Sequence, residues 1–248
     1  MAERERIARA FVLLLAVQAV VLLAQGKSCR HRLADHIRGV DKWTFDPPKN
    51  IYGKERNVHK QKSSLIVQDF KGNGTSSQSP AWIWANNDIE AGINKQINRE
   101  LFAHYTYLSM AAHFGRDDIH LPGFAAFFKK AAEEEYTHAH MFMEFLNKRG
   151  GRVKLHHIMK PCRDHWGNGL MAMRDALYLE KEINHALLDL HQVADTNRDP
   201  QVQDFLESNF LGEQVDSIKT LANYVSTLQR LGGGLGEYQF DKETLGAK

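Results

Sequence analysis

The sequence lacks several features that would assign it to a common functional class. Its one long apolar run, from Phe11 to Ala24, has 14 residues, whereas a helix that crosses a bilayer needs about 20. The formal net charge is only +2, so charge gives no indication of a nucleic-acid partner. Patterns typical of β-strands are scarce. With 248 residues, the chain is expected to form one or two globular domains.

Cysteine is also scarce, since the chain contains only Cys29 and Cys162. In an oxidising compartment the two thiols can form a disulfide, within the chain or between subunits. Two free thiols are the alternative, and the sequence does not choose between them.

The first 26 residues resemble a secretory signal peptide. Arginines lie near the start, the apolar run follows, and Ala24 and Gly26 supply small residues for cleavage. A mitochondrial presequence, the main alternative, would be amphipathic and poor in acids, whereas this segment carries Glu3 and Glu5. Residues 1–26 are therefore predicted to be removed, leaving a secreted chain without membrane association that begins at Lys27. Mitochondrial and cytoplasmic locations are the alternatives.

Residues 27–86 form a basic, irregular extension. They contain 11 Lys and Arg against 5 Asp and Glu, whereas the part from Asn87 onward has 18 against 23. Segments rich in Gly, Ser and Pro interrupt any periodicity, which indicates an extension rather than a folded core. Asn73 lies in an Asn-Gly-Thr sequon, which matters only if the protein is secreted. Whether Asn73 is glycosylated stays open.

From Asn87 onward, apolar residues recur at helical spacing. Helix caps, prolines and glycines divide this part into four long helices and a short one. The predicted ranges are 87–114, 122 to 149–151, 168–196, 200 to 232–234, and 235–244. A helix of 28 residues is about 42 Å long. Four helices of this length predict an all-α four-helix bundle.

Each long helix has polar residues on its apolar stripe. In the segment EEEYTHAH, Glu135 and His138 fall on the stripe that continues through Phe128 and Phe142, while the neighbouring charges face elsewhere. The other stripes contribute further polar groups near mid-helix. These are Glu100, His104 and Tyr107 in the first helix, Glu180, Asn184 and His191 in the third, and Gln214 in the fourth, on a stripe with Leu211 and Ile218.

Three inward carboxylates require a partner. Burying one carboxylate costs several kcal/mol unless it is paired or bound to metal, and three together repel one another. Bound cations remove this conflict, and a Glu-x-x-His pair on one helix face is an arrangement that bundles use for iron and manganese. The stripes therefore predict a metal cluster inside the bundle.

A second Glu-x-x-His pair, Glu182 and His185, lies on the third helix. Two residues correspond to about 200° of helical rotation, so Glu180 and Glu182 do not face the same side. Glu180 is predicted to point inward, and Glu182 and His185 to lie on the solvated surface.

Several stretches resemble eukaryotic ferritin of the heavy, ferroxidase type. They are INKQINRELFAHYTYLSMA, EEEYTHAH, RGGRV, LYLEKEINHALLDLH, DPQVQDFLESNFLGEQVDSIK and EYQFDKETLG, and the resemblance covers residues 87–248. It implies a four-helix bundle with a long crossover and a short fifth helix. It also implies 24-subunit shells that store hydrated ferric oxide, built from this chain alone or mixed with other ferritin subunits. The signal peptide and the long extension resemble those of secreted invertebrate ferritins.

The resemblance also implies roles for particular residues. A di-iron ferroxidase centre would use Glu100, Glu135 and His138 for one iron and Glu180, with Glu135 bridging, for the other. Gln214 and Tyr107 would lie close to this centre. Fe²⁺ and O₂ are the implied substrates.

Further positions match the family unevenly. Asp204 and Glu207 match the acidic residues of a three-fold iron channel, where their charge would attract Fe²⁺. The family's mineral-nucleating glutamates correspond to Glu134, Thr137 and His140, which is a departure from the usual trio. At the four-fold axis, Gln239 and Glu243 replace apolar or His residues that are common there.

Two other functional classes stay open. One is a non-catalytic iron-carrying or structural subunit of a mixed shell, which loss of any of the five ligands would favour, although none is lost. The other is a di-iron oxygenase acting on an organic substrate. It would need a second inward Glu-x-x-His pair and a substrate pocket, and the sequence indicates neither.

Overall fold

The computed structural model describes residues 79–84 and 87–246. The predicted signal peptide, most of the extension, Asn73 and Cys29 lie outside the described residues. Within the described ranges there is no β-strand, as the sequence predicts. No helix in this part of the chain is long and apolar enough to cross a membrane.

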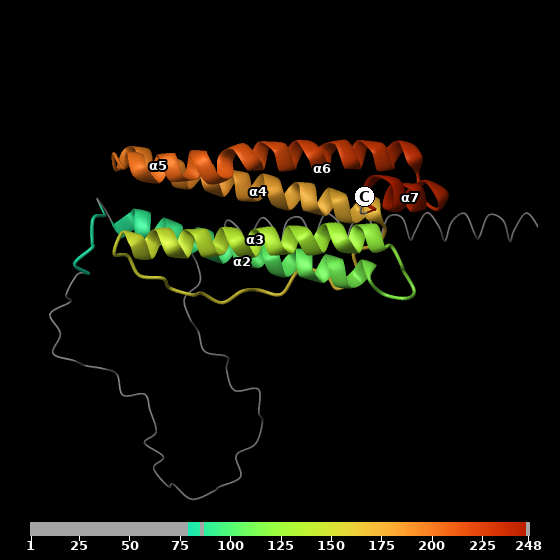
Figure 1. Cartoon of the computed structure of the whole chain (residues 1–248), viewed down its shortest axis with the longest axis horizontal. Coiled ribbons are helices and arrows are strands. Elements are labelled where there is room, and N and C mark those ends of the chain that lie inside the picture. Colours follow the sequence, from blue (N-terminus) through green and yellow to red (C-terminus); the bar gives the residue numbers. More distant parts are fainter. Residues whose placement is uncertain (1–78, 85–86, 247–248) are drawn as a thin grey trace, which may run out of the picture.

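Four long helical segments pack into a bundle (Figure 1). The first three are α2 (Asn87–Phe114), α3 (Pro122–Lys148) and α4 (Gly169–Thr196). The fourth is composed of α5 (Pro200–Leu206), the π-helical turn η2 (Glu207–Leu211) and α6 (Gly212–Leu231). The long crossover, residues 149–168, returns along the bundle, so α3 and α4 run in the same direction. The predicted bundle with a long crossover is confirmed.

Local capping explains where these helices begin and end. The Asn168 side chain accepts a hydrogen bond from the Met171 N–H at 3.0 Å, which caps α4. Asp199 caps α5 in the same way through the Val202 N–H, and Pro200 follows at the first helical position. After α3, Gly150 has a φ of +77°, a conformation that glycine adopts at little cost. The predicted boundaries are therefore correct to within a residue or two.

Aromatic side chains fill both ends of the bundle core. Phe114 stacks on Phe124 and Phe128 towards one end, with ring centroids 5.1 and 5.7 Å away. On α3 and η2, Phe142 and Phe210 stack with centroids 4.4 Å apart. These rings are buried, and such pairs stabilise the fold beyond the area that they bury. The middle of the bundle, between the two aromatic clusters, is polar.

The fourth segment differs from the predicted regular helix. Its buried residues Val202, Leu206, Phe210 and Gln214 recur every four positions. In an α-helix each step of four overshoots a full turn by about 40°, so three such steps would leave the buried face. The wider π-turn absorbs the difference. Leu211 of the predicted stripe packs against the core but is only half-buried, while the neighbouring Phe210 takes a fully buried position.

The crossover is tied closely to the bundle. Asn94 donates to the Arg152 carbonyl at 3.0 Å and accepts from the Lys154 N–H at 2.6 Å. At its far end the crossover pairs with α4, since Arg163 lies 3.1 Å from the buried carboxylate of Asp175. Cys162, within the crossover, is disulfide-bonded. The structure therefore excludes a free thiol at Cys162.

This packing overturns the prediction for Glu182. The side chain is only 5% exposed, whereas a solvated position was predicted. Glu182 lies two turns after Asp175 and hence on the same face of α4, which the crossover approaches through Arg163. His185 is exposed, as predicted. The pair therefore does not form a second inward Glu-x-x-His site.

The predicted short fifth helix consists of α7 (Leu235–Gln239) and η3 (Phe240–Thr244). Its acidic side chains cap two helices of the bundle. Asp241, fully buried, accepts from the Phe124 N–H at 2.9 Å near the start of α3. Glu237 accepts from the Gly169 N–H at 2.5 Å, at the start of α4. Because helix N-termini present unpaired N–H groups and positive potential, these carboxylates anchor the short helix to the bundle.

Candidate metal centre

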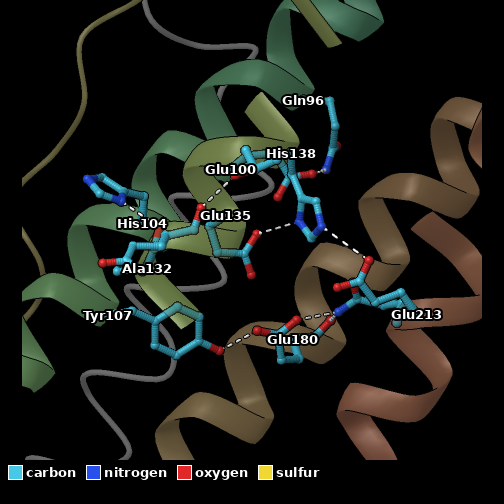
Figure 2. A network of polar contacts seen from close by, with 12 residues as sticks. Gln96, Glu100, His104, Tyr107, Ala132, Glu135, His138, Glu180 and Glu213 are labelled. Atoms are coloured by element: carbon cyan, nitrogen blue, oxygen red, sulfur yellow. Dashed lines mark hydrogen bonds and ion pairs between the residues drawn. The ribbon is translucent and has the colours of Figure 1, made fainter. Parts of the chain in front are cut away.

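The polar middle of the bundle brings together side chains from four helical segments (Figure 2). Each lies well inside its helical segment, away from the ends of the bundle. The residues are Glu100 and Tyr107 on α2, Glu135 and His138 on α3, Glu180 on α4, and Gln214 on α6. All are buried except His138, which is half-buried. The inward orientation predicted for these six residues is confirmed.

Glu100, Glu135 and His138 form the tightest group. Each offers a ligand atom within 4.8 Å of the other two. His138 Nδ1 lies 3.2 Å from Glu135 Oε2, because a spacing of three residues places both side chains on one face of α3. Glu100 Oε1 accepts a 2.7 Å hydrogen bond from Gln96. Its Oε2 is buried and has no hydrogen-bond partner among the described residues, so it is available to a ligand.

Glu180 completes the other side of the centre. Its carboxylate accepts hydrogen bonds from the Tyr107 hydroxyl and from the Gln214 amide. The same amide group lies 3.0 Å from the Glu180 backbone carbonyl. Gln214 and Tyr107 therefore hold Glu180 from α6 and α2, facing Glu135.

Burial and mutual repulsion disfavour the charged forms of these acids. Burial raises the pKa of Glu100 well above its usual range, and the neighbouring Glu135 carboxylate raises it further. Burial, followed by the charge of Glu180, has the same effect on the pKa of Glu135. The pKa of Glu180 is also raised by burial, although the hydrogen bonds from Tyr107 and Gln214 oppose the shift. Burial and the Glu180 charge raise the pKa of Tyr107 as well.

The residues present could hold a metal cation at Glu100, Glu135 and His138. Three carboxylates and one imidazole form a donor set of hard oxygen and borderline nitrogen ligands, which suits iron or manganese. A bound cation would stabilise the charged forms of the acids and give Glu100 Oε2 its missing partner. The Glu135 carboxylate interacts both with Glu100 and with Glu180. It is therefore the acid that two bound cations could share.

A pocket of about 380 Å³ opens onto this centre. Centre residues Tyr107, Glu135, His138, Glu180 and Gln214 line it, and further charged groups surround them. The additional charged residues are Lys130, Glu134, Glu213 and Asp216. The sequence did not indicate this pocket. Phe127, Ala131, Leu221 and Tyr224 also line the pocket, so its lining is both polar and apolar.

The other predicted metal residues lie outside this centre. Glu134 is exposed at the pocket and forms a 3.0 Å ion pair with Lys130. Asp204 and Glu207 are exposed on α5 and η2, and Glu207 lies 2.7 Å from His191 Nε2. His104, also on an apolar stripe, does not join the centre, because its Nδ1 lies 2.7 Å from the Ala132 carbonyl.

Two residues that contact the centre were not predicted. Gln96 precedes Glu100 by four residues, so helical spacing alone contains the signal for their hydrogen bond. Glu213 Oε2 lies 3.3 Å from His138 Nε2. Nothing in the local sequence indicates this contact, because it depends on how α6 packs against α3.

Comparison with known proteins agrees with this architecture. Residues 90–231 match the family model described as a ferritin-like domain. The chain is 59% identical to soma ferritin of Lymnaea stagnalis over 158 residues, which are 64% of this chain and 91% of that protein. It is 55% identical to ferritin heavy chain of Echinococcus granulosus over 158 residues, again 64% and 91% of the two chains.

The chain belongs to the ferritin family.

A vertebrate relative extends the similarity, since this ferritin is 52% identical to the ferritin middle subunit of Salmo salar over 166 residues. That match covers 66% of this chain and 94% of the relative. The relatives thus match most of their own length, whereas about a third of this ferritin falls outside the similarity. Residues 27–86 precede the part that the family model matches.

Proposed function

We propose that this ferritin is a ferroxidase subunit that oxidises Fe²⁺ with O₂ at the centre described above. Glu100, Glu135 and His138 would bind one iron, and Glu180, with Glu135 bridging, the other. The grouping of Glu100, Glu135 and His138 ligand atoms within 4.8 Å is the observation that carries the proposal. Ferritin family membership makes iron the expected substrate cation.

The side chains supply the conditions for oxidation. Carboxylate oxygens are hard ligands that favour Fe³⁺ over Fe²⁺, so each iron loses its electron to O₂ more readily when it is bound. Gln214 and Tyr107 orient Glu180 through hydrogen bonds. The open pocket leaves room for Fe²⁺, O₂ and water beside the centre.

Fe³⁺ would then pass to a ferric oxide mineral inside a 24-subunit shell. At the positions where the family has nucleating glutamates, this chain has Glu134, Thr137 and His140, all exposed. Glu134 is also paired with Lys130. Weaker nucleation by this surface favours a mixed shell, in which other subunits supply nucleating carboxylates. A mainly iron-carrying or structural role within such a shell is the second candidate.

The test is aerobic oxidation of Fe²⁺ by the purified, assembled protein, beside its mass from size-exclusion chromatography. Replacing Glu135 by Ala removes the proposed bridge and should slow Fe³⁺ formation by at least about tenfold, or about 1.4 kcal/mol in the barrier. Glu133→Ala is the control, since Glu133 is exposed and pairs only loosely with Lys129 at 4.0 Å. Glu182 does not serve as a control because it is buried. Equal rates in wild type and Glu135→Ala would refute the ferroxidase proposal.

A further inference from the structure

His138 lies between two carboxylates that come from different helices. Its Nδ1 is 3.2 Å from Glu135 Oε2, and its Nε2 is 3.3 Å from Glu213 Oε2. Figure 2 shows the ring between these groups, with Glu213 on the side away from Glu135. The His138 side chain is only 15% exposed, whereas Glu213 is 53% exposed. Glu213 therefore contacts the His138 ring from the solvent-exposed side of the centre.

A neutral imidazole has one N–H and one lone pair, and only the lone pair binds a metal. Nδ1 is the nitrogen that faces Glu135, which is a member of the group of possible metal ligands. Nδ1 can act as a ligand only if the proton is on Nε2. A carboxylate accepts hydrogen bonds and donates none when it is ionised, so Glu213 stabilises the tautomer with the proton on Nε2.

We propose that Glu213 is a positioning residue that holds His138 in the Nε2–H tautomer, with the Nδ1 lone pair directed at the metal. This proposal rests on the proposed function, because it assumes that His138 binds a cation. A carboxylate behind a metal-binding imidazole also makes the ring a stronger ligand.

Other contacts of the ring do not perform this task. Phe210 packs edge-on against His138, with centroids 5.4 Å apart and planes at 73°. Such packing limits the tilt of the ring, but it does not distinguish its two nitrogens. Glu213 lies directly after the π-turn, in the first turn of α6, so the register of that turn brings it to Nε2.

The test compares two substitutions of Glu213 with a matched control. Glu213→Ala removes the acceptor, whereas Glu213→Gln keeps an oxygen that accepts the Nε2–H bond and removes the charge. Asp216→Asn removes a carboxylate from the same helix without touching His138. Anaerobic Co²⁺ titration of the assembled protein, followed by visible absorption, measures binding at the centre. Second-sphere changes of this kind cost about 10- to 100-fold in metal affinity.

We expect that loss for Glu213→Ala, and at most about a threefold loss for Glu213→Gln and Asp216→Asn. The second readout needs no metal. Nitrogen NMR of the assembled metal-free protein with ¹⁵N-labelled histidine reports the tautomer of His138, assigned by its absence in His138→Gln. The Nε2–H form should dominate in the wild type, and Glu213→Ala should lose that preference.

An unchanged tautomer or an unchanged Co²⁺ affinity in Glu213→Ala would overturn the proposal. Equal losses in all three variants would overturn it as well, because they would reflect charge alone. Wild-type protein that binds no Co²⁺ at the centre would remove both this proposal and the proposed function. Protein that binds Co²⁺ through His138 but does not oxidise Fe²⁺ would refute only the ferroxidase activity.

Discussion

At the scale of single residues, the centre is a compromise between folding and metal binding. Glu100, Glu135 and Glu180 are each at most 6% exposed, and an apolar side chain of similar size would be easier to bury at each position. Hydrogen bonds from Gln96, Tyr107 and Gln214 compensate part of this cost. The remainder is offset when the acids keep their protons, and it would be offset at higher pH by a bound cation, so stability and the proposed function are linked at these residues.

This linkage predicts how stability depends on pH. The raised pKa values of Glu100, Glu135 and Glu180 mean that the folded chain keeps carboxyl protons that the unfolded chain loses near pH 4. Stability from these groups is therefore present below the unfolded pKa and lost as pH rises through the folded pKa. The metal-free protein should therefore become less stable, with a lower melting temperature, as pH rises above the unfolded pKa of these carboxyls.

Differential scanning fluorimetry with and without Co²⁺ measures this effect. The cation binds the charged acids, so the stabilisation it gives should grow with pH. Glu135→Gln removes one titrating group and should flatten the profile of the metal-free protein. Identical profiles for wild type and Glu135→Gln would contradict the proposed cause.

At the scale of elements, the π-turn η2 controls what the fourth segment presents to the centre. It keeps Phe210 and Gln214 on one buried face, although the buried residues of this segment are spaced four apart from Val202 onward. Phe210 then packs on Phe142 and His138, while Gln214 reaches Glu180. The irregular turn thus belongs to the centre, in keeping with the frequent occurrence of π-turns at functional sites.

Deleting Ser208 tests this role. Ser208 is an exposed residue of the π-turn, and its removal should restore an α-helical turn. The tighter turn offsets the lost residue, so α6 keeps its phase relative to α5 and Gln214 still faces Glu180. Fe²⁺ oxidation should therefore stay within about threefold of the native rate, while the melting temperature should fall because core packing is disturbed.

The matched control is Ser208→Ala, which keeps the chain length and removes only an exposed 3.3 Å hydrogen bond to Asp204. It should behave like wild type. A deletion variant that oxidises Fe²⁺ at least about tenfold more slowly would show that the π-turn does more than absorb one extra residue.

At the scale of the whole molecule, the proposed function requires an assembly and a route for iron. Asp204 and Glu207 are exposed three residues apart on the fourth segment, close to its start at Pro200. Three copies around an axis would place six carboxylates around a pore, and their field would concentrate Fe²⁺ there.

Changing Asp204 to Asn and Glu207 to Gln keeps the size of both side chains and removes their charge. Fe²⁺ oxidation by the assembled protein should slow at low ionic strength, while Co²⁺ affinity at the centre stays native. Added salt should slow the wild type more than the double variant, because screening weakens steering. Glu133→Gln with Glu144→Gln is the charge-matched control on α3. A native rate for the channel variant in low salt would mean that iron enters elsewhere, with Gln239 and Glu243 the next candidates.

The proposed secretion gives a further prediction. Protein recovered from secretory cells should begin near Lys27, because signal peptidase cleaves after small residues such as Gly26. Glycan on Asn73 would be compatible with this route. N-terminal sequencing and mass spectrometry measure both. Mature protein recovered from mitochondria and cut far downstream of Lys27 would contradict secretion.

The four long helices and most of the residues of the centre could be predicted from the sequence. Caps and glycines such as Asn168 and Gly150 act within a few residues, so they are readable locally. The inward residues could also be predicted from local sequence. Glu135 and His138 interrupt an apolar stripe whose period is that of an α-helix. Burying a carboxylate costs free energy, so its place on an apolar stripe indicated a functional site.

Which further side chains are in contact could not be predicted, because those contacts arise from packing between segments. Glu182 is buried because the crossover packs against its face of α4, and helical periodicity contains no information about a covering loop. The π-turn changes the phase of α6, so Phe210 is fully buried while Leu211 is half-buried. Glu213 reaches His138 across 75 positions of sequence. These contacts depend on packing between segments that are distant in the chain. The periodicity of apolar residues gives information about one helix only.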